Sequence, residues 1–322
     1  MAISNKQNKL AVYVGDELAS YNFGAAHPFS PARHDAFYDA FSERGLSELA
    51  QVQMYSPVKC ARDDIALFHD EAYIEKVISQ SISGVGYLDC GDTPAIKGIY
   101  EAVCYVVGTA LDATHKIMAG EHAQAFIPIA GLHHARPESA SGFCVFNDCG
   151  IVIETLRQQY DLNCVAYVDI DAHHGDGVFY AFKDDPYVIF ADMHEDGRYL
   201  YPGTGREQET GSGAGKGRKL NIAMEPAAND VAMLKRWPEV ENLLREFKPD
   251  FIILQCGADS INGDPITHLK YSEKAHFHAA QRLTVLANEF GHGRVLALGG
   301  GGYNLSNIAK GWCAVVEGLL SV

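Results

Sequence analysis

The chain has 322 residues, a formal net charge of −15 at pH 7, 47% hydrophobic residues and 21% charged residues. This composition is too apolar for a disordered chain, and a chain of this length can bury about 75% of its unfolded surface. The acidic excess argues against a nucleic-acid partner or an anionic membrane surface and is compatible with a cationic substrate.

Apolar runs of strand length are continuous rather than alternating, which favours parallel strands that are buried on both faces. In chain order they are residues 10–14, 124–130, 164–170, 187–191, 219–224, 251–257 and 294–298. Longer patterned segments between them predict helices at 31–44, 70–80, 94–119, 147–160, 228–247, 271–290 and 303–320. The alternation predicts one α/β domain over residues 1–322, with three α/β/α layers and a mostly parallel central sheet. The Gly-rich stretch 202–218 fails the phosphate-loop pattern and is predicted to be a long surface loop.

Neither a membrane span nor a secretion signal is expected. No apolar run reaches the roughly 18 residues that a bilayer span needs, and the N-terminal sequence lacks a long apolar core followed by a small-residue cleavage site. The eight cysteines include no Cys-x-x-Cys pair, so we expect neither a zinc knuckle nor a disulfide framework. These features predict a cytoplasmic protein with reduced thiols.

Polar residues follow the C-terminal ends of several predicted strands. They are His133 and His134, the segment Asp169 to Asp176, the segment Asp192 to Glu195, Asp259, and Tyr303 after a run of four glycines. Because open parallel sheets bind ligands outside the C-terminal ends of their strands, we expect these residues to converge on one site.

The spacing of Asp169, Asp171 and His173 predicts a metal site. Residues two apart on an extended chain share one face, and burying carboxylates without a compensating cation is costly. Mixed carboxylate and imidazole ligands suit Zn²⁺, with Fe²⁺, Mn²⁺ and Co²⁺ as alternatives. Asp171 and His173 would supply two ligands and Asp259 a third, which leaves the open position of a catalytic site.

Several segments resemble the histone deacetylase superfamily, which includes acetoin-utilisation-type proteins and acetylpolyamine amidohydrolases. They are HPFSPAR (27–33), HHARPESASGFCVFND (133–148), VDIDAHHGDGV (168–178), YPGTG (201–205), LQCGADSINGDP (254–265) and LALGGGGYNLSNIAKGW (296–312). The resemblance implies an arginase/deacetylase-like fold. It also implies a zinc-dependent hydrolase that removes acetyl groups from acetyl-lysine in proteins or peptides, or alternatively from an acetylated polyamine or another small amide.

The resemblance also implies roles for individual residues. Asp171, His173 and Asp259 match the zinc ligands. The residues that match the catalytic set, which works on a metal-activated water, are the tandem His133 and His134, Asp169 behind His133, Asp176 behind His134, and Tyr303 as the donor to the oxyanion. The matches to the substrate tunnel are Gly142, Phe143, Tyr201, Gly301 and the rim residue Asp92, for which Asp89 is a competing alignment. Arg33 matches an arginine near the inner cavity.

The family also holds a structural monovalent cation, usually K⁺. Its ligands here would be Asp169, the backbones of Asp171 and His173, and the segment Asp192–Met193. Asp192 stands where the animal enzymes carry a serine, which leaves the details of the K⁺ site open. Tyr201 replaces a phenylalanine and would make the tunnel mouth slightly more polar.

Two other functions are compatible with parts of the sequence. A binuclear manganese ureohydrolase shares the Asp-Ala-His motif at 171–173 but needs further ligands for its second metal. A non-catalytic binding module would be expected to have lost Tyr303, a tandem histidine or a metal ligand, and all of these are present. We expect no nucleic-acid or membrane partner, and a homo-oligomer is left open.

Overall fold

Continuous apolar sequences form a parallel sheet. The computed structural model describes residues 10–322, and within that range eight strands follow the order β2-β1-β3-β8-β7-β4-β5-β6 with every pairing parallel. The strands are β1 (Leu10–Tyr13), β2 (Val52–Tyr55), β3 (Gln124–Ile127), β4 (Val165–Asp169), β5 (Val188–Glu195), β6 (Lys219–Met224), β7 (Phe251–Gln255) and β8 (Val295–Leu298). Residues 1–9, the first part of the N-terminal sequence in which no secretion signal is expected, lie outside the described residues.

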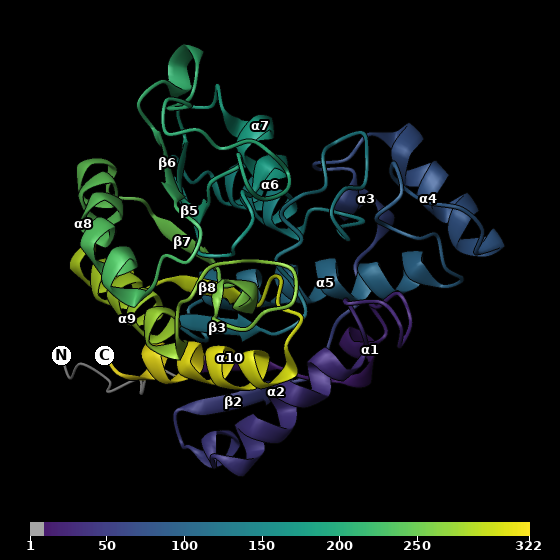
Figure 1. The fold of residues 1–322 in the computed structure, drawn as a ribbon, viewed down its shortest axis with the longest axis horizontal. Coiled ribbons are helices and arrows are strands. Elements are labelled where there is room, and N and C mark those ends of the chain that lie inside the picture. The colour runs from purple at the N-terminus through teal and green to yellow at the C-terminus, as the bar shows by residue number, and fades with distance from the viewer. Residues whose placement is uncertain (1–9) are drawn as a thin grey trace.

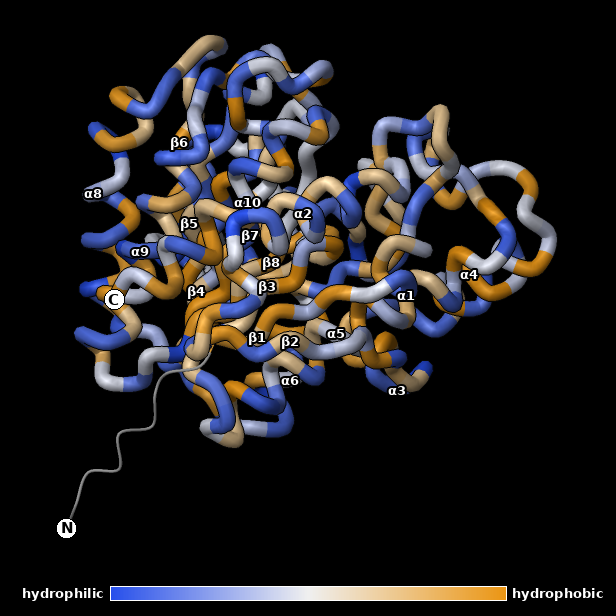
Figure 2. Tube along the Cα trace, turned by 90° about the horizontal axis from the view of Figure 1, so that it is seen from below, coloured by the Kyte–Doolittle hydropathy of each residue, from blue (hydrophilic) through white to orange (hydrophobic). Residues whose placement is uncertain are grey.

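Helices cover both faces of the sheet (Figure 1). They are α1 (Asp16–Ala19), α2 (Ala32–Glu43), α3 (Arg62–Ile65), α4 (Glu71–Ser83), α5 (Ile99–Met118), α6 (Asp148–Tyr160), α7 (Asp176–Phe182), α8 (Asp230–Phe247), α9 (Glu273–Glu289) and α10 (Leu305–Leu320). Figure 2 shows α2 and α10 on one side of the apolar strands β3, β7 and β8, with α5 and α6 on the other side. The predicted three-layer α/β class is therefore confirmed. No helix in the described range is long and apolar enough to span a membrane.

The structure differs from the predicted elements in several places. The one-turn helices α1 and α3 were not predicted, because four residues are too few to show a helical repeat. The strand β2 was not predicted, because it lies at the sheet edge and its partly exposed sequence VQMY has no continuous apolar run. Helix α7 begins within the polar segment that follows β4. The prediction that Asp192 to Glu195 follow a strand is wrong, because these residues pair with β6 and continue β5 to Glu195.

The sheet order explains why the polar segments meet. The strands β3, β8, β7, β4 and β5 are neighbours in this order and all run parallel. The segments at their C-terminal ends therefore lie along one continuous edge, which is where ligands bind in open parallel sheets.

Candidate active site

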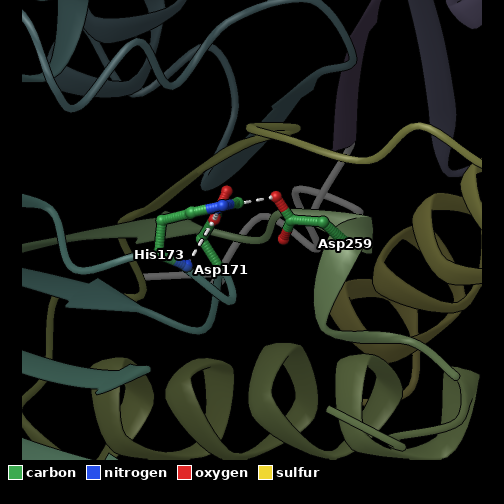
Figure 3. Close-up of side chains that lie close together, drawn as sticks. All are labelled: Asp171, His173 and Asp259. Carbon is green, nitrogen blue, oxygen red and sulfur yellow. Dashed lines mark hydrogen bonds and ion pairs between the residues drawn. The ribbon is translucent and has the colours of Figure 1, made fainter. Parts of the chain in front are cut away.

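Three buried side chains from two neighbouring strand ends converge at this edge. Asp171 and His173 follow β4, and Asp259 follows β7 in a short 3-10 turn. The His173 Nδ1 atom is 3.1 Å from Oδ1 of Asp171 and 3.1 Å from Oδ2 of Asp259 (Figure 3). One ligand atom from each residue lies within 4.8 Å of the others, and no second cluster of this kind occurs in residues 10–322.

The charge of this cluster fits a bound cation. Although burial disfavours the charged imidazole, hydrogen bonds to Asp171 and Asp259 raise the pKa of His173 to about 10. Burial, together with the charge of Asp171, raises the pKa of Asp259 to about 7. Even a protonated His173 leaves two buried carboxylates with one positive charge, and an unpaired buried charge is costly. A divalent cation bound by both carboxylates and a neutral imidazole would remove the imbalance.

The tandem histidines are each oriented by an aspartate. His133 Nδ1 lies 2.8 Å from Asp169 Oδ2, and His134 Nδ1 lies 2.7 Å from Asp176 Oδ1. Because an ionised carboxylate only accepts hydrogen bonds, the His134 ring beside Asp176 carries its proton on Nδ1. The pKa of Asp169, by contrast, is raised well above its usual value by burial and by the charges of Asp192 and Asp171. The two Nε2 atoms lie 3.1 Å apart, so a proton taken up by one of them lies within hydrogen-bond reach of the other.

The surroundings of His134 favour a neutral base beside an ionised carboxylate. Burial lowers the pKa of His134 to about 4, and His133 acts in the same direction. Burial would raise the pKa of Asp176, but hydrogen bonds from His134 and Arg136 lower it to about 2. Arg136 Nη2 donates to Asp176 Oδ2 at 2.9 Å. At neutral pH, His134 therefore has a free lone pair on Nε2 and a charged partner behind Nδ1.

Tyr303 comes directly after the glycine run 299–302 that follows β8. It lines the same small space as Asp171, His173 and Asp259, which are here called the metal cluster. A Cβ atom on Gly301 would lie 2.1 Å from Asp259 Oδ2 and 2.9 Å from Asp171 Oδ2, so no larger residue fits beside the predicted metal ligands. Burial raises the pKa of Tyr303 well above its usual value. The hydroxyl therefore stays protonated at neutral pH and can donate a hydrogen bond.

A pocket of about 250 Å³, here called the main pocket, leads from the surface to these residues. Its lining residues are Asp92, His134, Gly142, Phe143, His173, Leu200, Tyr201, Ile266 and Tyr303. A further space of about 20 Å³ lies against Asp171, Asp259 and Gly301. A larger cavity of about 470 Å³ is lined by residues of the loop 196–208 and the end of β6, and none of the predicted site residues lines it. Leu200 and Ile266 were missed because a single apolar loop residue carries no sequence signal.

Asp89 and Asp92 have different positions at the rim. Asp92 lines the main pocket, whereas Asp89 Oδ1 accepts hydrogen bonds from the amides of Gly91, Asp92 and Thr93, each at 2.9 Å. The Thr93 hydroxyl donates to Asp89 Oδ2 at 2.6 Å and accepts from the amide of Phe143 at 3.1 Å. Phe143 has a φ of 68°, which is a costly backbone conformation for a residue with a side chain. Asp89 therefore holds the rim turn together, and Thr93 connects that turn to Phe143.

The residues predicted for the structural cation lie at and just after the end of β4 and within β5. Asp192 pairs in register with Asp169, and its Oδ1 lies 2.7 Å from His194 Nδ1. The other ring nitrogen of His194 lies 2.8 Å from the carbonyl oxygen of Gly205. Both nitrogens face acceptors, and Asp192 raises the pKa of His194 although burial lowers it. The carboxylate that replaces the expected serine thus has a histidine partner within the fold, next to buried Met193.

Arg33 lies in α2 beneath the glycine run. Its Nε donates to the carbonyl oxygen of Gly302 at 2.8 Å and its Nη2 to that of Gly300 at 2.5 Å. The guanidinium carbon is 3.9 Å from the ring centroid of Phe29, and Nη1 has no partner in the described chain. Phe29 and Gly300 line the inner space, so Arg33 lies directly behind its wall.

Comparisons with known proteins agree with this arrangement. A family model of the histone deacetylase domain matches residues 27–319. The chain is 33% identical over 308 residues to the acetoin utilization protein AcuC of Bacillus subtilis (strain 168). This match covers 92% of this chain and 78% of that protein. It is 31% identical over 327 residues to AcuC of Staphylococcus xylosus, and this match covers 99% of this chain and 84% of that protein.

A solved structure shows the same fold. The crystal structure of the HDA15 HD domain matches with a TM-score of 0.87 at 24% identity, and the match covers 98% of this chain and 89% of that one. The resemblance drawn from the sequence motifs is confirmed by the family match and by both relatives. The chain belongs to the histone deacetylase domain family and is a hydrolase of the deacetylase class that acts on amides.

Proposed function

We propose that this deacetylase removes the acetyl group from acetyl-lysine side chains of peptides or proteins. The observation that carries the proposal is the main pocket, which has aromatic walls and is lined by His134, His173 and Tyr303. These three residues also line the small space against Asp171 and Asp259. Phe143 and Tyr201 would flank the apolar methylene stem of a lysine, with Gly142 and Gly301 giving close approach. Asp92 is the one carboxylate at the mouth among the lining residues, and it would accept hydrogen bonds from the peptide backbone.

The donor set favours one zinc ion in the cluster. Asp171, His173 and Asp259 would hold it, and they leave a position open, as catalytic sites do. When bound, zinc supplies a Lewis acid that activates water and polarises an amide carbonyl. Asp169, Asp192 and Met193, with the backbones of Asp171 and His173, would hold a structural K⁺.

The chain's own residues would then move the protons. His134 would accept a proton from the attacking water on Nε2, while ionised Asp176 stabilises the imidazolium through Nδ1. One histidine of the pair, with Asp169 behind His133, would return a proton to the nitrogen of the leaving amine. The hydroxyl of Tyr303 would donate to the carbonyl oxygen as negative charge develops there.

The test is a panel of kcat/KM values for acetyl-lysine peptides, acetylputrescine and acetylspermidine. We expect the peptides to exceed both polyamines about tenfold or more, because neither polyamine has the backbone amides that would donate to Asp92, and a hydrogen bond to a charged group contributes about 1.5–3 kcal/mol. The Tyr303→Phe variant is measured in parallel, and a loss of activity in this variant assigns the activity to this pocket. A preference for acetylspermidine would overturn the substrate class and support the second candidate, an acetylpolyamine deacetylase, which the net charge of −15 also suits.

Metal stoichiometry tests the remaining alternative. The described chain holds a single three-residue cluster, whereas a binuclear manganese ureohydrolase needs ligands for a second ion. One zinc per chain supports the deacetylase, and two manganese ions per chain would contradict it.

A further inference from the structure

Between β2 and α5 the chain leaves the sheet and builds part of the main pocket's surroundings. This segment, residues 61–103, is here called the rim excursion, and it contains α3, α4 and the turn with Asp92. In Figures 1 and 2, α4 lies at the end of the molecule farthest from α8 and α9. The Tyr73 hydroxyl donates to the carbonyl oxygen of Val145 at 2.6 Å, and the amide of Asn147 donates to His69 Nε2 at 2.8 Å. The rim excursion thus supports the segment that carries Phe143.

Two cysteines lie at the two ends of the rim excursion. The amide of Cys60 donates to the carbonyl oxygen of Cys104 at 3.0 Å, and the two thiols lie close enough for Cys104 to raise the pKa of Cys60. A Cβ atom on Gly108 would lie 2.3 Å from the amide nitrogen of Cys60, so the chain around Cys60 rests directly on α5. Standard bond lengths across such a backbone hydrogen bond keep the two Cα atoms within about 7 Å. A disulfide requires about 4.4–6.8 Å, so the backbone is already in position.

The environment of the pair favours oxidation chemistry. Hydrogen bonds from Cys60 and Tyr100 lower the pKa of the Cys104 thiol despite its burial, and Lys59 adds positive charge nearby. Cys104 is buried while Cys60 is partly exposed, so solvent reaches the pair from the side of Cys60. A thiolate stabilised by a neighbouring thiol is the arrangement that reacts with small oxidants and then forms a disulfide.

We propose that Cys60 and Cys104 form a reversible disulfide that closes the rim excursion at its base when the protein meets a peroxide. The Cys104 thiolate attacks one oxygen of hydrogen peroxide, the O–O bond breaks, and a sulfenic acid and hydroxide result. The Cys60 sulfur then attacks the Cys104 sulfur, the S–S bond forms, and the sulfenic oxygen leaves as water. Two thiols are oxidised and one peroxide is reduced to two waters. The covalent link opposes local opening of the rim excursion.

The test uses the full chain with Cys90→Ser and Cys164→Ser, because Cys90 is exposed and Cys164 partly exposed. The folded protein is treated with hydrogen peroxide, quenched with catalase, denatured and alkylated. We expect the loss of two hydrogen masses, two fewer alkylated thiols, a linked peptide pair containing Cys60 and Cys104, and reversal by dithiothreitol. Cys60→Ser or Cys104→Ser in this background should abolish the link. The same treatment of urea-unfolded protein should give mixed pairings.

The proposed consequence has its own measurement. The oxidised chain should show a thermal midpoint higher by about 3–5 °C and slower proteolysis within 84–98, because the link constrains a long loop. The pairing is overturned if Cys60→Ser still loses two thiols, or if Cys104 ends as a sulfinic or sulfonic acid while Cys60 stays reduced. The closing role is overturned if the disulfide forms and neither the midpoint nor proteolysis within 84–98 changes.

Discussion

The hydroxyl of Thr93 connects the rim turn to the pocket wall, and Thr93→Val removes it without changing the size of the side chain. In the structure this buried hydroxyl donates to Asp89 at 2.6 Å and accepts from the amide of Phe143 at 3.1 Å. A hydrogen bond to a charged group contributes about 1.5–3 kcal/mol, and a buried donor left without a partner costs about 1–3 kcal/mol. Asp89 keeps its three backbone donors, which limits the loss.

The two contributions add to about 2.5–6 kcal/mol. Because Asp89 keeps its three backbone donors, we expect Thr93→Val to lower the free energy of unfolding by less than this sum, by about 2–4 kcal/mol. Phe143 would lose the contact that holds its φ of 68°. If about 1–2 kcal/mol of the loss appears in substrate binding, KM rises roughly 5–30-fold. The value of kcat should change much less, because Thr93 contacts neither the metal cluster nor the tandem histidines.

The assay is urea unfolding with steady-state kinetics on an acetyl-lysine peptide. Thr93→Ser keeps both hydrogen bonds and should recover most of the lost stability and the normal KM. Thr155→Val is a matched control, because the buried Thr155 hydroxyl has no partner in the described chain, and its removal should be neutral or stabilising. Equal losses for Thr93→Val and Thr93→Ser would refute the hydrogen-bond explanation, as would a Thr155→Val loss as large as that of Thr93→Val.

Three further predictions concern the metal cluster and its surroundings. Tyr303→Phe should keep its metal and lose about 10²–10³-fold in kcat, as removal of an oxyanion donor does, and near-normal kcat would remove Tyr303 from the catalytic set. Gly301→Ala should lose bound metal before it loses secondary structure, because its Cβ would overlap Asp259 Oδ2; normal metal content by elemental assay would contradict the close approach. Chelation should lower the thermal midpoint more at pH 8 than at pH 7, and an equal or smaller effect at pH 8 would mean that the buried charges are balanced without a cation.

Much of the sheet was predictable because its strands are buried on both faces. Six of the eight strands contain buried residues only, so burial on both faces appears as a continuous apolar run. The edge strand β2 is partly exposed and has no such signal. Helix α7 was not predicted because Asp176, which orients His134, is also its first residue, and a polar functional residue hides the beginning of a helix.

The candidate site was predictable where chemistry restricts the residue type. Carboxylates and imidazoles spaced along a strand end have few other uses, so the metal cluster could be proposed from spacing. The roles of Asp89 and Thr93 depend on a turn whose geometry brings one hydroxyl to Phe143, and no pattern in the sequence encodes that contact. The salt bridge between Asp192 and His194 was missed for a related reason, because both residues were expected after the strand and not within it.

The buried carboxylates explain why stability and metal binding should be linked. Without a cation, the pKa of Asp259 is about 7 in the folded chain against an ordinary value of 3.8, so folding favours its protonated form. The stability associated with that proton is complete below about pH 4 and is lost as the pH rises through 7. His173 contributes in the same way. Its pKa is raised from 6.5 to about 10, so the stability associated with its proton is complete below about pH 6.5 and is lost as the pH rises through 10. A bound divalent cation would replace these protons and would bind more tightly as its ligands deprotonate, so the stability difference between the loaded and chelated protein should widen between pH 7 and pH 8.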